Sequence, residues 1–324
     1  MVEKLNFALL GCGLFGVNNI LPAFLHTEHS NLIALTKRDG ASAKKIADAF
    51  GVPKAYSDND RKEMLNAEID AVYIATPNAM HMKDTIEALE AGKHVIVEKP
   101  MAMNVDECFQ MMDKEKETGC QIMIAHCMRF TNVIHYFNEI IASEKIGKLV
   151  LVTSDFLSRG KDSKRPWKFV KDIAGGGAAF DLGSHMVDTI RYISQSPVEN
   201  IQVTRIPKDL KPEEMDLVSN FLLRFENSVV GRATSSYLGP RKTFLEVYGE
   251  TGFLRAYDWN LYNRDIKIVQ EIAGKYEEKT VYNSDYYAEM IDKFSQAILN
   301  HTKIPVPSSE GLENQKIIDL VNKT

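Results

Sequence analysis

The first 125 residues alternate short apolar runs with longer amphipathic segments. Apolar runs of four or five residues are typical of buried strands, whereas the longer segments repeat their apolar residues at helical spacing. The predicted strands are 6–10, 32–35, 71–75, 94–97 and 121–125, and the predicted helices are 15–26, 41–50, one through 88–89, and 106–116. Strands that alternate with helices predict βαβ units and a parallel sheet.

The second half has a different pattern, in which strands follow one another directly. Strands are predicted at 148–156 and, after a glycine-rich helix, at 217–225, 229–237, 243–248, 252–257 and 266–269. Turn residues separate these runs, which predicts an antiparallel or mixed sheet. Helices 286–299 and 309–321 close the chain. We predict two domains, 1–126 and 127–324, and we expect the last helix to pack against the first domain.

Composition and charge limit the classes of function. The 324 residues carry a net charge of −5 and a pI near 6.0, which exclude an electrostatic preference for nucleic acid or anionic membranes. The four cysteines and eight histidines lack the short spacings of metal ligands, so we predict no metal site and free thiols. The N-terminal apolar stretch is too short for a signal peptide, and no segment approaches the roughly 20 apolar residues that span a bilayer. A cytoplasmic location is expected.

The run Gly11-Cys12-Gly13-Leu14-Phe15-Gly16 follows a predicted strand and opens a helix. In this context the G-x-G-x-x-G spacing is the fingerprint of a dinucleotide site. Gly11 makes the tight turn, Gly13 lets backbone approach a pyrophosphate, and Gly16 allows close helix packing. Leu14 and Phe15 are predicted cofactor contacts within the same loop. The alternative is a plain glycine turn of a doubly wound fold.

The end of the second predicted strand bears on the choice between NAD and NADP. NAD-preferring sites place an acidic residue there to hold the ribose 2′-hydroxyl. Here the strand ends on Thr36, Lys37 and Arg38. An ammonium and a guanidinium suit a 2′-phosphate, whereas Asp39 lies late and is explained equally as a helix cap. NADP(H) is therefore favoured over NAD(H), with Lys37 and Arg38 as binding residues.

Glu98-Lys99-Pro100 follows the predicted strand 94–97. Ligands of open α/β sheets bind outside the carboxyl ends of the strands, so Lys99 is expected to face the cofactor cleft. Its ammonium could hold a forming alkoxide. The alternative is a solvated lysine at a strand end, and sequence does not decide whether the bond to Pro100 is cis.

A run from Gly175 to Asp188 contains Asp181, His185 and Asp188. On an α-helix these positions share one face, which predicts a single titratable stripe. The triple glycine before it allows close approach to another segment or to a ligand. A carboxylate beside an imidazole tunes a proton donor near neutral pH. The alternative is a solvated polar helix face.

These motifs resemble the glucose-fructose oxidoreductase / inositol dehydrogenase (Gfo/Idh/MocA) family along essentially the whole chain. The matching segments are Gly11–Gly16, 75–78 with His81, 91–95 before Glu98-Lys99-Pro100, Arg129-Phe130 and 175–188. The resemblance implies an α/β fold, with an N-terminal Rossmann domain and a C-terminal α/β domain that has a large open, mostly antiparallel sheet. One face of that sheet would cover the active site, and the other would form a homo-oligomer, a dimer or tetramer.

The resemblance also implies roles for individual residues. Lys99 resembles the catalytic lysine, Asp181 the substrate-binding aspartate and His185 the proton-transferring histidine of the family. Asp188, a turn further on, is interpreted as a supporting structural carboxylate. Further cofactor-binding residues implied are Thr76, Pro77, Asn78, His81 and Glu98. Proline and asparagine are equally explained as turn formers, and His81 as a residue packed at a helix start.

Two further features have open interpretations. Arg129 either reaches substrate or forms a structural salt bridge at the domain boundary. Lys161, Lys164, Arg165, Trp167 and Lys168 are interpreted first as a solvated basic loop. Alternatively, Trp167 stacks on a sugar ring and the cations bind an anionic substrate such as a sugar phosphate. Tyr237 is interpreted as a packing residue.

The expected activity is hydride transfer between the nicotinamide and a carbinol or carbonyl carbon of a sugar, polyol or related compound. The protein would thus be an NAD(P)-dependent dehydrogenase or reductase acting on CH–OH groups. The alternatives are a non-catalytic dinucleotide-binding regulator and a redox-neutral NAD-dependent glycosidase. A regulator has no need to retain Lys99, Asp181 and His185, which favours an enzyme.

Overall fold

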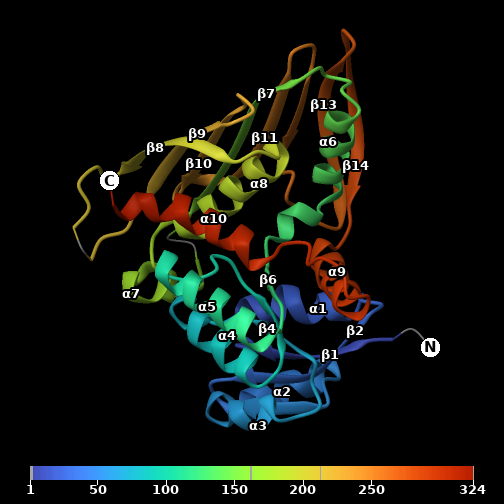
Figure 1. Ribbon diagram of the computed structural model, residues 1–324, viewed down its shortest axis with the longest axis vertical. Coiled ribbons are helices and arrows are strands. Elements are labelled where there is room, and N and C mark those ends of the chain that lie inside the picture. Colours follow the sequence, from blue (N-terminus) through green and yellow to red (C-terminus); the bar gives the residue numbers. More distant parts are fainter. Residues whose placement is uncertain (1–2, 161–162, 212, 324) are drawn as a thin grey trace. The chain divides into compact units, whose positions relative to one another are not determined.

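A computed structural model describes residues 3–160, 163–211 and 213–323 (Figure 1). The chain divides into two units. The first consists of Met1–His126 and Tyr287–Gln315, and the second of Cys127–Tyr286 and Lys316–Thr324. The first break falls where the apolar pattern changes. The second predicted domain, 127–324, is interrupted, because Tyr287–Gln315 belongs to the first unit.

The first unit contains a six-stranded parallel sheet in the order β3-β2-β1-β4-β5-β6. The strands are β1 (Leu5–Leu10), β2 (Ser30–Lys37), β3 (Lys54–Ser57), β4 (Ala71–Ile74), β5 (His94–Val97) and β6 (Ile122–Ile124). The chain starts at β1, builds outward to β3 and returns to β4 beside β1. Ligands of open α/β sheets bind at such a switch point. The predicted parallel sheet is confirmed, and β3 is added at its edge.

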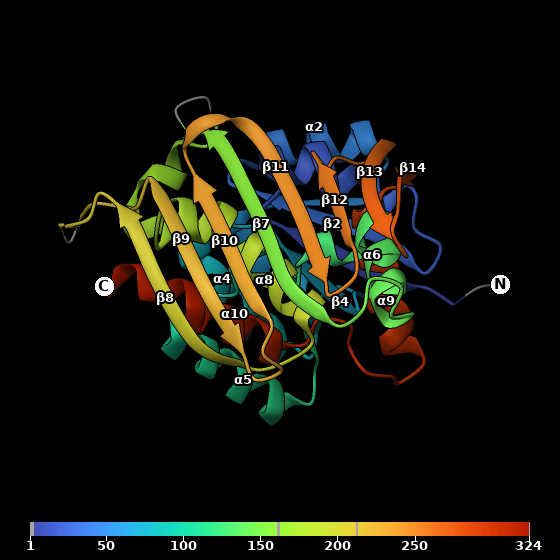
Figure 2. The same cartoon turned by 90° about the horizontal axis from the view of Figure 1, so that it is seen from above.

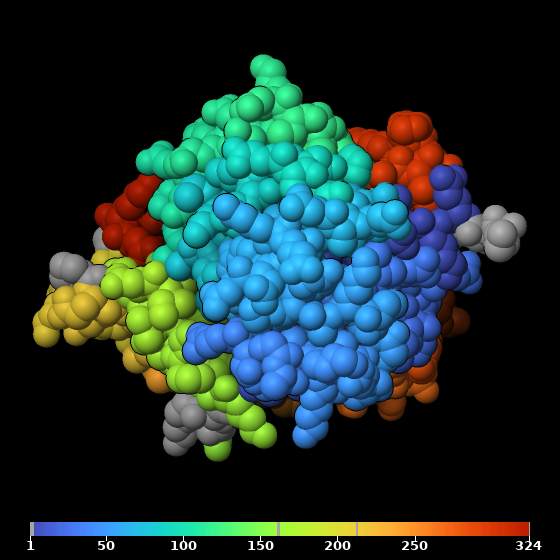
Figure 3. Space-filling view, turned by 90° about the horizontal axis from the view of Figure 1, so that it is seen from below, coloured from blue at the N-terminus to red at the C-terminus, as the bar shows by residue number. Residues whose placement is uncertain are grey.

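Helical segments alternate with these strands, and Figure 3 shows the surface formed by the blue and cyan segments of this unit. They are the π-helical η1 (Gly16–Ile20), α1 (Leu21–Phe24), α2 (Gly40–Phe50), α3 (Arg61–Leu65), α4 (His81–Glu90), α5 (Val105–Thr118), α9 (Tyr286–Leu299) and α10 (Ser308–Ile318). None of the helices in the described ranges combines the length and apolarity that a membrane crossing requires.

Helix α9 lies in the first unit because it packs on β1 and on the turn before β2. The ring centroids of Phe294 and Phe7 are 6.1 Å apart. Asp292 accepts hydrogen bonds from the backbone N–H groups of Glu28, at 2.7 Å, and His29, at 2.9 Å. These contacts join segments more than 250 positions apart in sequence, which local periodicity does not reveal.

The second unit contains an eight-stranded sheet in the order β14-β13-β12-β11-β7-β10-β9-β8 (Figure 2). The strands are β7 (Leu149–Arg159), β8 (Val198–Ile206), β9 (Val218–Phe225), β10 (Val230–Ser236), β11 (Leu238–Gly249), β12 (Phe253–Tyr257), β13 (Arg264–Ile272) and β14 (Lys275–Asn283). Only β7 and β10 pair in parallel among the described neighbours. The mostly antiparallel sheet is therefore confirmed.

The two faces of this sheet have different surroundings. The helices of the unit are α6 (Asn132–Ala142), α7 (Lys171–Ala174) and α8 (Ser184–Ser194). On the face toward α8, the hydroxyl of Ser154 contacts the sulfur of Met186 at 2.9 Å, and Val152 is fully buried. Alternate residues point to the opposite face, where Leu222 is 44% and Tyr257 58% exposed.

Candidate functional site

The three fingerprint glycines have different surroundings at the end of β1. Gly11 has a φ of +86°, and a Cβ atom on it would lie 2.6 Å from Cγ2 of Thr76. A Cβ on Gly13 would meet its nearest neighbour atom at 4.0 Å, whereas one on Gly16 would meet Leu9 at 3.4 Å. The loop thus has the tight turn, the open backbone and the close helix packing that a pyrophosphate requires, and it fits a dinucleotide.

The two residues between Gly13 and Gly16 differ in exposure. Leu14 is 48% exposed at the surface of the loop. The ring of Phe15 packs edge-on against Tyr287, with centroids 5.8 Å apart. The glycine loop therefore packs against Tyr287, which belongs to the C-terminal segment of the same unit.

The end of β2 places two cations next to the glycine loop. The Lys37 ammonium donates to the carbonyl oxygen of Cys12 at 3.1 Å, and Arg38 is exposed. Asp39 accepts the hydroxyl of Ser42 at 2.6 Å and its N–H at 3.0 Å, and these hydrogen bonds lower the pKa of the carboxyl. Asp39 is thus the N-cap of α2, so its oxygens are engaged within the helix.

His81, fully buried at the start of α4, connects two loops. Its Nδ1 lies 2.9 Å from the carbonyl oxygen of Pro100, and its Nε2 lies 3.0 Å from that of Thr76. Burial lowers the pKa of the imidazole, and each ring nitrogen that carries a proton donates to the carbonyl oxygen it faces. Thr76 donates its own hydroxyl to Asp84 at 2.7 Å. His81 therefore fixes the loops that follow β4 and β5.

Glu98 and Lys99 lie directly after β5. Tyr73 of β4 donates its hydroxyl to Glu98 at 2.7 Å, and the peptide bond after Lys99 is cis. Pro77 precedes a short helical turn in which Asn78 is buried. The predicted residues of the first unit thus lie at the carboxyl ends of β1, β2, β4 and β5, where the fold predicts a ligand.

In the second unit, Asp181 is at the centre of a polar network. It lies in a π-helical turn, Ala179–Gly183, that leads into α8 and His185. The Lys168 ammonium contacts Oδ1 of Asp181, and the Tyr237 hydroxyl donates to Oδ2 at 3.1 Å. The side chain of Lys168 is only 8% exposed, so the interpretation of this lysine as solvated is wrong. A buried ammonium requires a counter-ion, and Asp181 supplies it.

Tyr237 also packs, as the sequence predicts, but its hydroxyl has a polar role that the sequence did not reveal. Its ring centroid is 5.5 Å from that of Phe169. Burial and the Asp181 carboxylate raise the pKa of the hydroxyl, so it stays protonated and can only donate to Asp181. The two partners are 56 residues apart, and no local pattern connects them.

Asp188 forms an ion pair of its own with Arg129. Arg129 donates to it from Nε at 3.0 and 3.1 Å and from Nη2 at 2.6 Å, with side chains 6% and 1% exposed. The guanidinium also lies 4.7 Å from the ring centroid of Tyr192. Arg129 therefore forms a structural salt bridge in this unit. Because Asp188 is buried, it does not form one accessible stripe with Asp181 and His185.

Asp216 holds the glycine-rich turn before Asp181. It is fully buried and accepts the N–H of Gly177 at 2.9 Å and that of Ala179 at 2.7 Å. A Cβ on Gly177 would lie 1.9 Å from the carbonyl oxygen of Asp216. The glycines thus allow close approach of another chain segment. Asp216 is not predictable from the sequence, because a lone aspartate before a strand carries no local signal.

The remaining residues of the basic loop differ in burial. Trp167 and Arg165 are half-buried, and Lys164 is exposed. Lys161 lies outside the described residues. Trp167 belongs to the helical turn Pro166–Phe169, which also carries Lys168. The loop is thus anchored on Asp181 through one lysine.

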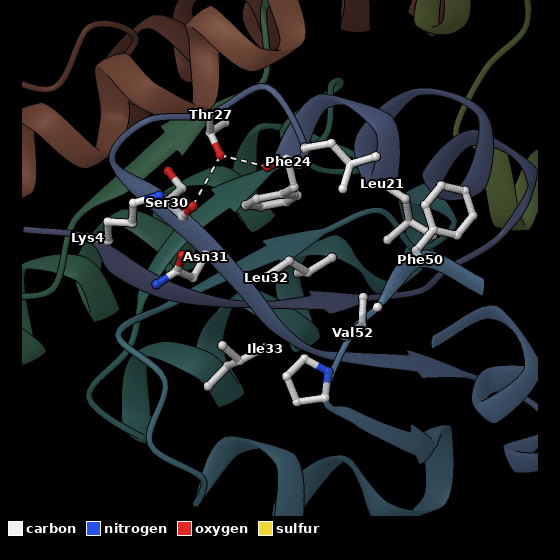
Figure 4. Close-up of a pocket in the computed structure, with 13 residues that line it drawn as sticks. Lys4, Leu21, Phe24, Thr27, Ser30, Asn31, Leu32, Ile33, Phe50 and Val52 are labelled. Atoms are coloured by element: carbon white, nitrogen blue, oxygen red, sulfur yellow. Dashed lines mark hydrogen bonds between the residues drawn. The ribbon is translucent and has the colours of Figure 1, made fainter. Parts of the chain in front are cut away.

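A separate pocket in the first unit is lined by residues of α1, of the start of β2 and of the segment after α2 (Figure 4). Its volume is about 430 Å³. Leu32 and Val52 line it, and the Thr27 hydroxyl donates to the carbonyl of Ser30 at 3.2 Å beside it. Because β2 runs from Ser30 to Lys37, the pocket lies at the end of the strand opposite the glycine loop. The predicted site residues do not line it.

Comparisons with known proteins cover both units. A profile described as "Oxidoreductase family, NAD-binding Rossmann fold" matches residues 5–126, and "GFO/IDH/MocA C-terminal domain" matches 134–255. D-xylose 1-dehydrogenase (NADP(+)) 2 of Haloferax volcanii is 28% identical over 97% of this chain and 95% of the relative. An uncharacterized oxidoreductase of Synechocystis is 30% identical over 99% and 94%. The crystal structure of aldose-aldose oxidoreductase from Caulobacter crescentus, complexed with glycerol, has a TM-score of 0.89 at 25% identity, over 99% and 97%.

The parallel sheet with its glycine loop, the second sheet and the profile matches define an NAD(P)-dependent oxidoreductase of the dehydrogenase and reductase type. Within this class, the chain belongs to the Gfo/Idh/MocA family. The family resemblance predicted from the motifs is confirmed.

Proposed function

We propose that this protein transfers hydride between a nicotinamide cofactor and a carbinol or carbonyl carbon of a sugar or polyol, with NADP(H) preferred. The observation that carries the proposal is the Asp181 network beside His185 in a chain that also has a dinucleotide loop. The names of the Haloferax and Caulobacter proteins, which refer to xylose and aldoses, support a sugar-like substrate.

The side chains have complementary roles in this reaction. When bound, the nicotinamide supplies or accepts the hydride. His185 exchanges the hydroxyl proton of the substrate as general acid and base. Lys99 orients the reacting oxygen and stabilises the negative charge that develops on it.

Asp181 has a supporting role. With one carboxylate oxygen on the Lys168 ammonium and the other accepting from Tyr237, its side chain is fixed and charged. A fixed carboxylate can accept a neighbouring substrate hydroxyl through its remaining lone pairs. Asp181 thereby orients the substrate, and it does not act as the base.

The preference for NADP(H) rests on the end of β2. Asp39 caps α2 and gives its oxygens to Ser42, so it is engaged where an NAD site needs a free carboxylate. Lys37 is held on the glycine loop, and Arg38 is exposed beside it. A guanidinium at this position suits a doubly charged 2′-phosphate.

Replacing Arg38 with alanine is expected to raise the Kd of NADPH by roughly tenfold or more and to leave that of NADH nearly unchanged. The reason is the loss of a charge-assisted hydrogen bond to the 2′-phosphate. Calorimetric titration of both cofactors measures the two changes. Lys44→Ala, on the exposed side of α2, is the matched control and should change neither value. Equal affinity of the wild type for NADPH and NADH would refute the preference.

We also propose a homo-oligomer, a dimer or tetramer, built through the face of the eight-stranded sheet that points away from α8. That face exposes the apolar side chains of Leu222 on β9 and Tyr257 on β12, which support an interface between copies of the chain. Light scattering should give two or four times the chain mass of 36.5 kDa. A mass of one chain at micromolar concentration would contradict the proposal.

A further inference from the structure

Arg241 lies on the same face of the eight-stranded sheet as His185. Its guanidinium carbon is 5.9 Å from the ring centroid of Phe156, and the His185 ring centroid is 6.4 Å from that same ring. Phe156 is paired with Thr243 in the sheet, two residues beyond Arg241. The contact with Phe156 places the Arg241 side chain on the α8 side, where the cation and the imidazole both lie next to the same aromatic ring.

A second cation lies next to the Asp181 network. Arg165 is half-buried and directly precedes the turn Pro166–Phe169, whose Lys168 contacts Asp181 and whose Phe169 ring packs on Tyr237 with centroids 5.5 Å apart. Asp181 itself is neutralised by Lys168, and the buried Asp216 is engaged by backbone N–H groups. The carboxylates of Asp181 and Asp216 thus already have ionic or hydrogen-bond partners.

Neither arginine has an acidic partner among the residues that the structure describes. Of the residues that the structure describes, none forms an ion pair or hydrogen bond with the side chain of Arg241 or Arg165. The neighbouring Lys242 points to the opposite face and pairs with Asp258 at 3.4 Å. The two arginines add positive charge to this region, whereas the protein as a whole has a net charge of −5.

We propose that Arg241 and Arg165 form an oxyanion-binding subsite beside His185, so that the substrate is a sugar or polyol bearing a carboxylate or phosphate group. This inference rests on the proposed function. Two guanidinium groups without acidic partners attract an anionic group and hold it through bidentate hydrogen bonds. The exposed Arg241 side chain has a cation–π contact with the Phe156 ring, which directs its guanidinium toward this side of the sheet.

The test uses substrates that differ in one group: D-glucose, D-glucuronate and D-glucose 6-phosphate, each with NADP⁺. We expect kcat/KM of at least one anionic sugar to exceed that of glucose by about tenfold or more. Arg241→Gln should remove most of that advantage through KM and leave the value for glucose within about twofold. The two anionic arms separate a carboxylate from a phosphate as the bound group.

Lys242→Gln is the matched control, because it removes the adjacent cation from the opposite face and should preserve the preference. Equal kcat/KM for all three sugars would overturn the proposal, and so would an Arg241→Gln effect confined to the KM of NADP⁺. Binding of the three sugars is measured in parallel by calorimetry with NADP⁺ present. Anion-selective binding without turnover would contradict the proposed function but support the subsite. Turnover without anion selectivity would support the proposed function but contradict the subsite.

Discussion

His185→Ala is expected to lower kcat by roughly 100-fold or more while the Kd of NADPH stays within about threefold of the wild type. General acid–base groups contribute factors of this size, and removal of the imidazole leaves the substrate proton without a positioned acceptor. Lys99→Met should lower kcat to a similar extent, because the developing negative charge on oxygen loses its cation. Steady-state kinetics with a sugar substrate and titration with NADPH measure the two quantities.

His135→Ala is the matched control for the histidine. His135 is exposed on α6 of the same unit and is expected to leave kcat unchanged. The assignment fails if His185→Ala and Lys99→Met both retain wild-type turnover.

The largest effect on stability is expected from Asp188→Ala, which should lower the free energy of unfolding by about 3 kcal/mol or more. Arg129 and Asp188 are 6% and 1% exposed, so the substitution leaves a guanidinium buried without its counter-ion. Urea denaturation of the purified protein measures the loss. Because Asp188 lies three residues after His185 on α8, kcat should also fall.

The matched control is Glu199→Ala, which removes the acid of the exposed pair Arg224–Glu199 in the same sheet. Those side chains are 59% and 51% exposed, and an exposed pair contributes at most about 1 kcal/mol. Equal stability of Asp188→Ala and Glu199→Ala would show that the buried pair does not hold α8 in place.

The sequence predicts the strands in the interior of both sheets because their apolar periodicity is strong. The three strands that it did not predict, β3, β8 and β14, all lie at sheet edges. Edge strands are half exposed, so their sequences are polar, as in the Lys275–Asn283 segment, and carry no core pattern. Only the last helix is expected from the sequence to return to the first domain. The place of α9 in the first unit is not predicted, because its contacts with β1 and with the turn before β2 are long-range.

The site shows the same division between local and non-local information. The glycine loop is predictable because each glycine meets a local requirement of backbone conformation or packing. Lys168 and Tyr237 are not, since their contacts with Asp181 depend on segments that lie 13 and 56 residues away. Asp188 is interpreted from the sequence as a structural carboxylate, but its partner Arg129 lies 59 residues away and is identified only by the fold. The sequence thus reveals motifs, whereas the fold determines their partners.

The most direct test of the central claim follows nicotinamide absorbance while the wild-type protein acts on a panel of neutral and anionic aldoses and polyols. The proposed function predicts net formation of NADPH in proportion to substrate oxidised, with higher kcat/KM for NADP⁺ than for NAD⁺. Substrate conversion without net absorbance change would instead indicate redox-neutral chemistry. Tight NADP⁺ binding without conversion of any substrate in the panel would indicate a regulator, and either result would contradict the claim.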